Sequence, residues 1–328
     1  MLETRFRLVC TTAAFALTAA GACGANDGGG EPADGAEVPA GQESAAVLAL
    51  PLQDSTDRVA MIEGLSGPEA VRYDPGQDVY FVSNFNGAGD ARDGNGFISR
   101  AAADGSMEEL RFMVGTEDAP LHAPRGMYLV GDTLWVADAD GIHGFHRGTG
   151  SHLAFVDLSS FNPGFLNDVA AGPDEALYVT DTGEQSRIFR VTGHEVEVAM
   201  EEPRLGPPNG ITWDAAGGRF LVAPWGPGQG VHAWRPTGDV LLELLAPAPE
   251  GQMDGIEVLE GQIIVASQSD RTLHVVRSGQ LFPAIAVPGD PADIGIDTRR
   301  GRVAVPYIDL DRVDVWEWRP LPVPQESP

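Results

Sequence analysis

The segment PNGITWDAAGGRFLVAPW, residues 208–225, contains the pattern that decides the fold. A short run rich in strand-forming residues, ITW, is followed by the turn DAAGG and by a second apolar run, RFLVAP. Two such runs separated by a glycine-rich turn are typical of a β-hairpin. Asn209 stands before the first run, separated from it by Gly210, although asparagine is a poor strand residue. Asn209 therefore either turns the chain or supplies a side-chain oxygen that is needed at that place.

The same pattern occurs five more times along the chain. The other units begin PEAVRYD (68–74), PRGMYLV (124–130), LNDVAAG (166–172), MDGIEVL (253–259) and ADIGIDT (292–298). Counted at their second residues, the six units follow one another at steps of 56, 42, 42, 45 and 39 residues. A period near 40 to 45 residues with several strands per unit indicates a β-propeller blade. The longer first step contains the insertion NFNGAGDARDGNG, so the sequence predicts six blades.

Closure of the ring can also be predicted. The sixth unit ends after RVDVWEW (312–318), and the proline-rich RPLPVPQESP that follows is unsuited to pairing in a sheet. The segment DRVAMIEGL (57–65) precedes the first unit and is expected to supply the missing outer strand. We therefore predict an all-β fold, a six-bladed β-propeller closed by an N-terminal strand over residues 57–320, with a disordered tail at 321–328.

The N-terminal part reads as an export leader. Residues 1–22 contain two arginines followed by an apolar run too short to span a bilayer, which predicts a signal peptide. Cys23 follows two small residues, as at a bacterial lipoprotein cleavage site, so lipidation of Cys23 and ordinary secretion are the alternatives. Residues 23–56 have the composition of a flexible tether. We expect an exported protein of the cell envelope or periplasm, lipid-anchored or secreted, with no other membrane contact.

Composition excludes several classes of function. The net charge of −27 argues against nucleic acid, which requires a basic surface. All 21 basic residues are arginine, so Schiff-base chemistry and a P-loop lysine are excluded. Both cysteines, Cys10 and Cys23, lie in the leader, so the propeller has neither a disulfide nor a thiol nucleophile. No serine stands in a G-x-S-x-G setting, which argues against covalent ester hydrolysis.

The second residues of the six units are expected to open the innermost strands and to meet at one mouth of the central channel. They are Glu69, Arg125, Asn167, Asn209, Asp254 and Asp293. Any one of them alone is as well explained as a turn residue bonding its own backbone. Five oxygen-bearing side chains in matched positions instead indicate a hard cation, Ca²⁺ rather than Mg²⁺. Zinc is disfavoured because no histidine or cysteine is in the set.

Four segments carry a family resemblance: GPEAV (67–71), LNDVAAGPDEALYVTD (166–181), PNGITWD (208–214) and MDGIEV (253–258). They resemble the calcium-dependent propellers of the senescence marker protein-30/gluconolactonase (regucalcin-like) family, with a looser similarity to paraoxonases. The resemblance implies metal ligation by Glu69, Asn209 and Asp254, a metal or substrate contact for Asn167, and Asp254 as general base. Sugar-lactonase members carry an arginine where this chain has Phe165.

The predicted activity is metal-dependent hydrolysis of a small lactone or ester, with Ca²⁺ or another divalent cation as Lewis acid. Asp254 would accept the proton of water, Asn167 would contact the substrate or the metal, and Arg125 would hold a substrate carboxylate or hydroxyl. Loops after each second strand are expected to line the substrate rim with Asn84, Asp138, Asp181, Trp225, Gln268 and Tyr307. His143 and His146 lie on opposite faces of one strand, so they are not expected to share a metal.

The alternative function is a non-catalytic envelope scaffold with structural calcium, because a propeller does not by itself imply activity. The two functions differ in one structural feature. An enzyme should have an open cavity at the Glu69 end of the channel, whereas a scaffold should have that mouth filled by side chains.

Overall fold

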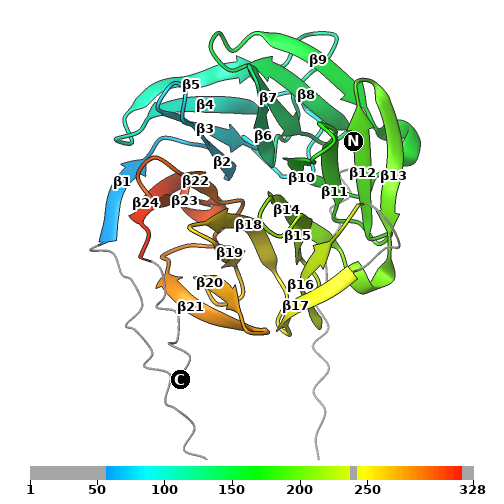
Figure 1. Ribbon diagram of the computed structural model, residues 1–328. Coiled ribbons are helices and arrows are strands. Elements are labelled where there is room, and N and C mark those ends of the chain that lie inside the picture. The colour runs from blue at the N-terminus through cyan, green and yellow to red at the C-terminus, as the bar shows by residue number, and fades with distance from the viewer. Residues whose placement is uncertain (1–56, 237–241, 320–328) are drawn as a thin grey trace, which may run out of the picture. The chain divides into compact units, whose positions relative to one another are not determined.

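A computed structural model describes residues 57–236 and 242–319. Within these residues the chain forms six antiparallel sheets of four strands each, arranged around a common axis (Figure 1). This arrangement confirms the predicted all-β, six-bladed β-propeller. The predicted signal peptide (1–22), tether (23–56) with Cys23, and tail (321–328) lie outside the described residues. In the described part of the chain, no helix has the length and apolar character needed to cross a membrane.

In five blades the strands follow one another outward from the axis in chain order, and the blades are linked by short loops and single 3₁₀ turns. The first three blades consist of β2 (Pro68–Asp74), β3 (Val79–Asn84), β4 (Phe97–Ala102), β5 (Met107–Val114); β6 (Met127–Val130), β7 (Thr133–Ala137), β8 (Gly141–His146), β9 (His152–Asp157); and β10 (Leu166–Ala171), β11 (Leu177–Asp181), β12 (Arg187–Thr192), β13 (Glu195–Glu201). The next two consist of β14 (Pro208–Asp214), β15 (Arg219–Pro224), β16 (Gln229–Trp234), β17 (Leu242–Ala248); and β18 (Met253–Leu259), β19 (Gln262–Ser267), β20 (Thr272–Arg277), β21 (Gln280–Ala286). The 3₁₀ turns η2 (Ser159–Phe161) and η3 (Pro203–Leu205) lie between blades, whereas η4 (Ile308–Leu310) lies within the sixth blade.

The sixth blade joins the two ends of the described chain. It contains β22 (Gly295–Asp297), β23 (Arg302–Tyr307) and β24 (Arg312–Glu317), and its fourth strand is β1 (Arg58–Ile62). β1 pairs antiparallel with β24, with Ile62 opposite Val313. The predicted closure by an N-terminal strand is therefore confirmed. Ile62 is fully buried, so the closing strand contributes core packing as well as backbone hydrogen bonds.

The hydrophobic core lies between the faces of neighbouring blades. One cluster, for example, packs Phe81 and Ile98 of the first blade against Leu134 and Phe145 of the second. Such packing supplies the stability of the ring, because the described residues contain no cysteine to form a disulfide.

Neighbouring innermost strands approach one another closely near the axis. A Cβ added at Gly210 would lie 2.3 Å from the backbone oxygen of Asp254, and one at Gly255 would lie 2.3 Å from the backbone nitrogen of Ile294. Both distances are shorter than atoms can approach without a shift of the backbone. Gly210 is therefore required for the close packing that brings Asn209 and Asp254 together, and Gly255 is required for the close packing of β18 against the sixth blade.

Candidate functional site

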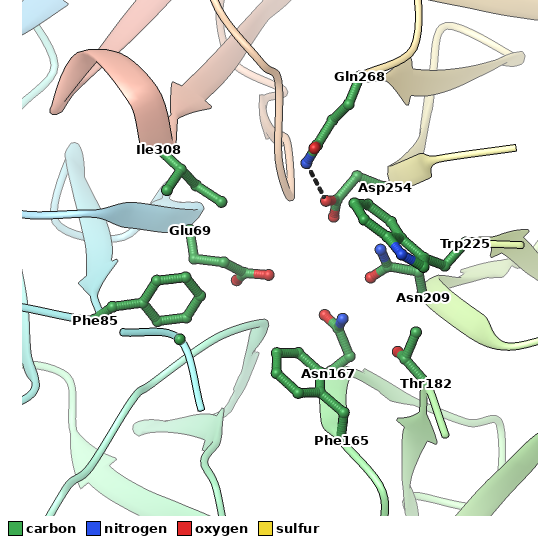
Figure 2. Close-up of a pocket in the computed structure, with 11 residues that line it drawn as sticks. Glu69, Phe85, Phe165, Asn167, Thr182, Asn209, Trp225, Asp254, Gln268 and Ile308 are labelled. Atoms are coloured by element: carbon green, nitrogen blue, oxygen red, sulfur yellow. Dashed lines mark hydrogen bonds between the residues drawn. The ribbon is translucent and has the colours of Figure 1, made fainter. Parts of the chain in front are cut away.

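Four innermost strands share an irregularity at their N-terminal ends. In β2, pairing with β3 shifts between Pro68 and Val71, and β10, β14 and β18 shift at the equivalent place. The extra residue is a β-bulge, a feature that redirects side chains. The second residue of each strand points toward the axis as a result, and these four side chains converge in Figure 2: Glu69, Asn167, Asn209 and Asp254.

The four side chains meet at a cavity of about 390 Å³. This volume lies within the range of sites for small molecules. The rest of the wall is largely apolar (Figure 2). The cavity is lined by Glu69, Phe85, Gly89, Phe165, Asn167, Thr182, Asn209, Trp225, Asp254, Gln268 and Ile308.

Each of the four convergent side chains has a buried oxygen without a hydrogen-bond partner. The atoms are Oε2 of Glu69 and the Oδ1 atoms of Asn167, Asn209 and Asp254, and none of these side chains belongs to a residue more than 4% exposed. The other oxygen of Asp254 accepts a hydrogen bond of 2.9 Å from Nε2 of Gln268. An unpaired buried acceptor costs about 1–3 kcal/mol, so four of them at one cavity favour the binding of an electropositive group there.

The carboxylates of this cavity repel one another and are poorly solvated. Burial, together with the charge of Asp168, raises the pKa of Asp254 to about 7, and interactions with the side chains of Gln268 and Asn209 oppose this rise. Burial, followed by the charge of Asp254, raises the pKa of Glu69 well above its usual range, with Arg125 opposing. A bound cation would relieve both effects, because it favours the ionised form of each carboxyl.

Further along the same strands, a second polar group links the innermost strands of several blades. Arg72 of β2 forms an ion pair with Glu257 of β18 and another, at 3.0 Å, with Asp293. Its guanidinium is also 3.8 Å from Asp168 of β10. Arg72 therefore crosses the axis from the first blade to three others. Asp293, grouped with the four convergent residues in sequence, belongs to this second group and does not line the cavity.

Arg125 is buried beside the cavity and does not line it. Its guanidinium donates to the backbone oxygens of Leu166, at 2.8 Å, and Gly89. The ring of Phe165 covers it, with 3.7 Å between the guanidinium carbon and the ring centroid. Phe165 and Gly89, which do line the cavity, separate the charge of Arg125 from the place where a substrate would lie.

Two of the six predicted rim residues, Trp225 and Gln268, line the cavity, and both come directly after the last residue of a second strand. In three other blades the lining residue is also the one after the strand: Phe85, Thr182 and Ile308. In these three blades the predicted rim residue is the one immediately before the residue that lines the cavity. The difference matters because successive side chains of a strand point to opposite faces.

The remaining predicted rim residues have buried positions outside the cavity. Asn84 accepts from the backbone nitrogen of Ser66, and Asp181 accepts from those of Gly164 and Phe165. They hold the loop that enters the first strand of the same blade. Tyr307 accepts a hydrogen bond from Trp316, and Asp138 accepts backbone hydrogen bonds from the loop before β6.

No family model matches the sequence, and no curated protein matches it. Solved structures with the same fold include a gluconolactonase from Xanthomonas campestris, with 15% identity and a TM-score of 0.61 over 81% of this chain and 93% of that one. They also include virginiamycin B lyase from Staphylococcus aureus, with 14% identity and a TM-score of 0.54 over 79% of this chain and 99% of that one. At this identity the likeness shows the shared fold alone, so the chemistry has to be inferred from the residues of the cavity.

Proposed function

We propose that the cavity binds a divalent cation through Glu69, Asn167, Asn209 and Asp254, and that the protein hydrolyses small lactones or esters there. The observation that carries the proposal is the set of four buried, unpartnered oxygens from four blades at one cavity. The donor set consists only of oxygen, which favours Ca²⁺. Since Ca²⁺ takes six to eight ligands, four protein side chains leave positions for water and substrate.

A bound cation would polarise the substrate carbonyl and stabilise the negative charge that develops on its oxygen. Asp254 is placed to act as general base, because its carboxylate lies at the cavity beside the proposed cation and each carboxylate oxygen keeps a second lone pair when the first is used by Gln268 or by the cation. Asp254 would accept a proton from water as the water oxygen bonds to the carbonyl carbon. As the C–O bond to the leaving oxygen breaks, Asp254 would return the proton to that oxygen.

The cavity wall indicates the kind of substrate. Phe85, Phe165, Trp225 and Ile308 surround the polar residues with apolar surface. Phe165 stands between the cavity and Arg125, so the guanidinium does not reach a substrate carboxylate. On the side of the cavity formed by Phe165, Asn167 is the polar side chain available to bind a substrate oxygen. The site therefore suits a lactone or ester with an apolar body better than a polyhydroxylated sugar lactone.

The open cavity also argues against the alternative of a non-catalytic scaffold. A purely structural cation is normally enclosed by protein ligands, whereas here the ligand residues face about 390 Å³ of open space. The gluconolactonase among the structures of the same fold is consistent with hydrolysis on this scaffold.

We expect the purified protein to hydrolyse alkyl- or aryl-substituted lactones and esters at least about tenfold faster than gluconolactone, measured as kcat/KM. A buried apolar contact of one or two methylene groups already gives this factor. EDTA should abolish the activity, and added Ca²⁺ should restore it. A panel of lactones and esters assayed with and without EDTA provides the measurement. Absence of metal-dependent hydrolysis across the panel would contradict the proposed function.

The stabilising effect of calcium should depend on pH. In the metal-free protein the pKa of Asp254 is raised to about 7, whereas an unfolded aspartate titrates near 4. Between these values the unfolded chain loses a proton that the folded chain keeps, so this group's contribution to stability falls as pH rises. Calcium needs the ionised form, so its affinity rises over the same range.

We therefore expect a calcium-induced increase in Tm that is at least twice as large at pH 8 as at pH 5, measured by calorimetry at fixed calcium. With calcium at 100 times its Kd, stabilisation would be about 2.7 kcal/mol at pH 8. Asp254→Asn should reduce the difference between the two pH values. Equal shifts at both pH values in the unaltered protein would contradict ligation by these carboxylates.

A further inference from the structure

A second group of potential metal ligands lies in the second blade, among residues that do not line the cavity. Asp138 follows β7, Asp140 lies two residues later, and His143 belongs to β8. One ligand atom from each of the three lies within 4.8 Å of the other two. None of the three is a wall residue of the cavity already described.

His143 provides the observation that points to a ligand. Its side chain is completely buried, and its Nε2 has no hydrogen-bond partner. This nitrogen lies 3.4 Å from Oδ2 of Asp138. The other ring nitrogen, Nδ1, is 3.1 Å from Nε2 of His152. If Nδ1 of His143 donates its proton to His152, Nε2 keeps a free lone pair, as a metal ligand requires.

The carboxylates of Asp138 and Asp140 also have lone pairs available to bind a cation. Backbone nitrogens of Ala123 and His122 each donate to one oxygen of Asp138 at 2.7 Å, which fixes the carboxylate and leaves a lone pair on each oxygen. Oδ1 of Asp140 is buried without a partner. The side chain of Asp140 is 23% exposed, which gives an ion access from solvent.

The charged side chains around this cluster do not take the place of a metal ion. His122 lies with Nε2 at 3.5 Å from Oδ2 of Asp140. Its Nδ1 accepts a hydrogen bond from the backbone nitrogen of Gly94, so the ring proton is on Nε2 and faces the carboxylate. In this state His122 is neutral and is not a ligand. Arg92 donates to the backbone oxygen of Ala139, and Arg125, whose charge interacts with Asp138, donates to the backbone oxygens of Leu166 and Gly89.

We propose that Asp138, Asp140 and His143 bind a transition-metal dication of the Zn²⁺ or Co²⁺ type. Two carboxylates and one imidazole favour such an ion over Ca²⁺, which prefers oxygen alone. Around a tetrahedral ion at about 2.1 Å from each ligand, ligand atoms are about 3.4 Å apart, which Nε2 of His143 and Oδ2 of Asp138 already are, so only the more widely spaced atoms of the cluster would have to move closer on binding. The site is independent of the proposed hydrolase function.

The test is a titration of the tag-free, metal-free full chain with Co²⁺ alone, in which binding is measured by the d–d absorption of Co²⁺ in the visible range. Zn²⁺ is then added as a competitor. With Ca²⁺ present in excess, we expect one site per chain, with Zn²⁺ displacing the Co²⁺. Asp140→Asn should weaken Co²⁺ binding at least about tenfold, because the loss of even an outer-shell partner of a metal ligand typically lowers affinity 10- to 100-fold. His143→Gln should weaken binding at least as much.

Asp254→Asn is the matched control, because it makes the same chemical change at the other site and should leave Co²⁺ binding unchanged. Thermal denaturation of each variant without metal shows whether it is folded, and Asp140→Asn is the more tolerant of the two cluster variants because Asp140 is partly exposed. Unchanged Co²⁺ stoichiometry and affinity in folded Asp140→Asn would overturn the proposal. Loss of the Co²⁺ site in Asp254→Asn instead would overturn it as well.

Discussion

Asp254→Asn should lower the rate of hydrolysis by a factor of about 10²–10⁴, and saturating calcium should not restore it. Asparagine keeps the volume and a ligand oxygen of aspartate but loses the negative charge and the capacity to accept a proton. Asp254 lines the cavity and has one oxygen without a partner, so its replacement would remove the proposed base. The measurement is kcat across a calcium titration, with the melting temperature recorded in parallel.

Asn209→Ala provides the comparison, since it removes a neutral ligand and leaves the base in place. We expect weaker calcium binding and a rate that recovers in part when calcium is raised. If calcium is structural only, both variants should instead lose stability and recover fully at high calcium. Full recovery of Asp254→Asn activity by calcium would rule out Asp254 as general base and leave the cation alone as the catalytic group.

Removal of the closing strand should have the second-largest effect. A chain beginning at residue 66 lacks Ile62, which is fully buried, and Leu65, which is 7% exposed, while a chain beginning at Asp57 retains both. Loss of each such side chain costs about 2–5 kcal/mol, and β24 is left with an unpaired edge. We expect the shorter chain to melt at least about 10 °C below the longer one or to fail to fold.

Two substitutions on the same strand separate side-chain packing from strand pairing. Ile62→Ala in the longer chain should lower Tm by an intermediate amount. Val59→Ala, at a position that is 45% exposed, should change stability by no more than about 0.5 kcal/mol. The measurement is thermal unfolding followed by circular dichroism. Equal melting temperatures for the two truncated chains would contradict the role of β1 in closing the ring.

The repeat made the fold predictable from sequence. Six units at a nearly constant step define the blades, and the shortage of one strand at the C-terminal end identifies β1 as the closing strand. The same register places Glu69, Asn167, Asn209 and Asp254 at equivalent positions. The structure shows a bulge behind each of them, which is why all four reach one cavity.

Features that depend on side-chain direction were not predictable from the repeat. Asn84 and Phe85 are neighbours in sequence, yet Phe85 lines the cavity while Asn84 holds a loop, because the direction alternates at the end of a strand. Arg125 occupies a ligand position of the repeat and is covered by Phe165. The glycines after Asn209 and Asp254 were a usable signal, since a glycine in an inner strand indicates close approach of a neighbouring backbone.

The position of Arg72 has a kinetic consequence for any chemistry in the cavity. Its ion pairs with Glu257 and Asp293 span the axis and obstruct passage through the ring. Breaking such a buried pair leaves an uncompensated charge, so the obstruction is costly to open. We therefore expect molecules to enter and leave the cavity on the side opposite Arg72. A product has to depart before the next substrate arrives, and a slowly departing product would act as a competitive inhibitor.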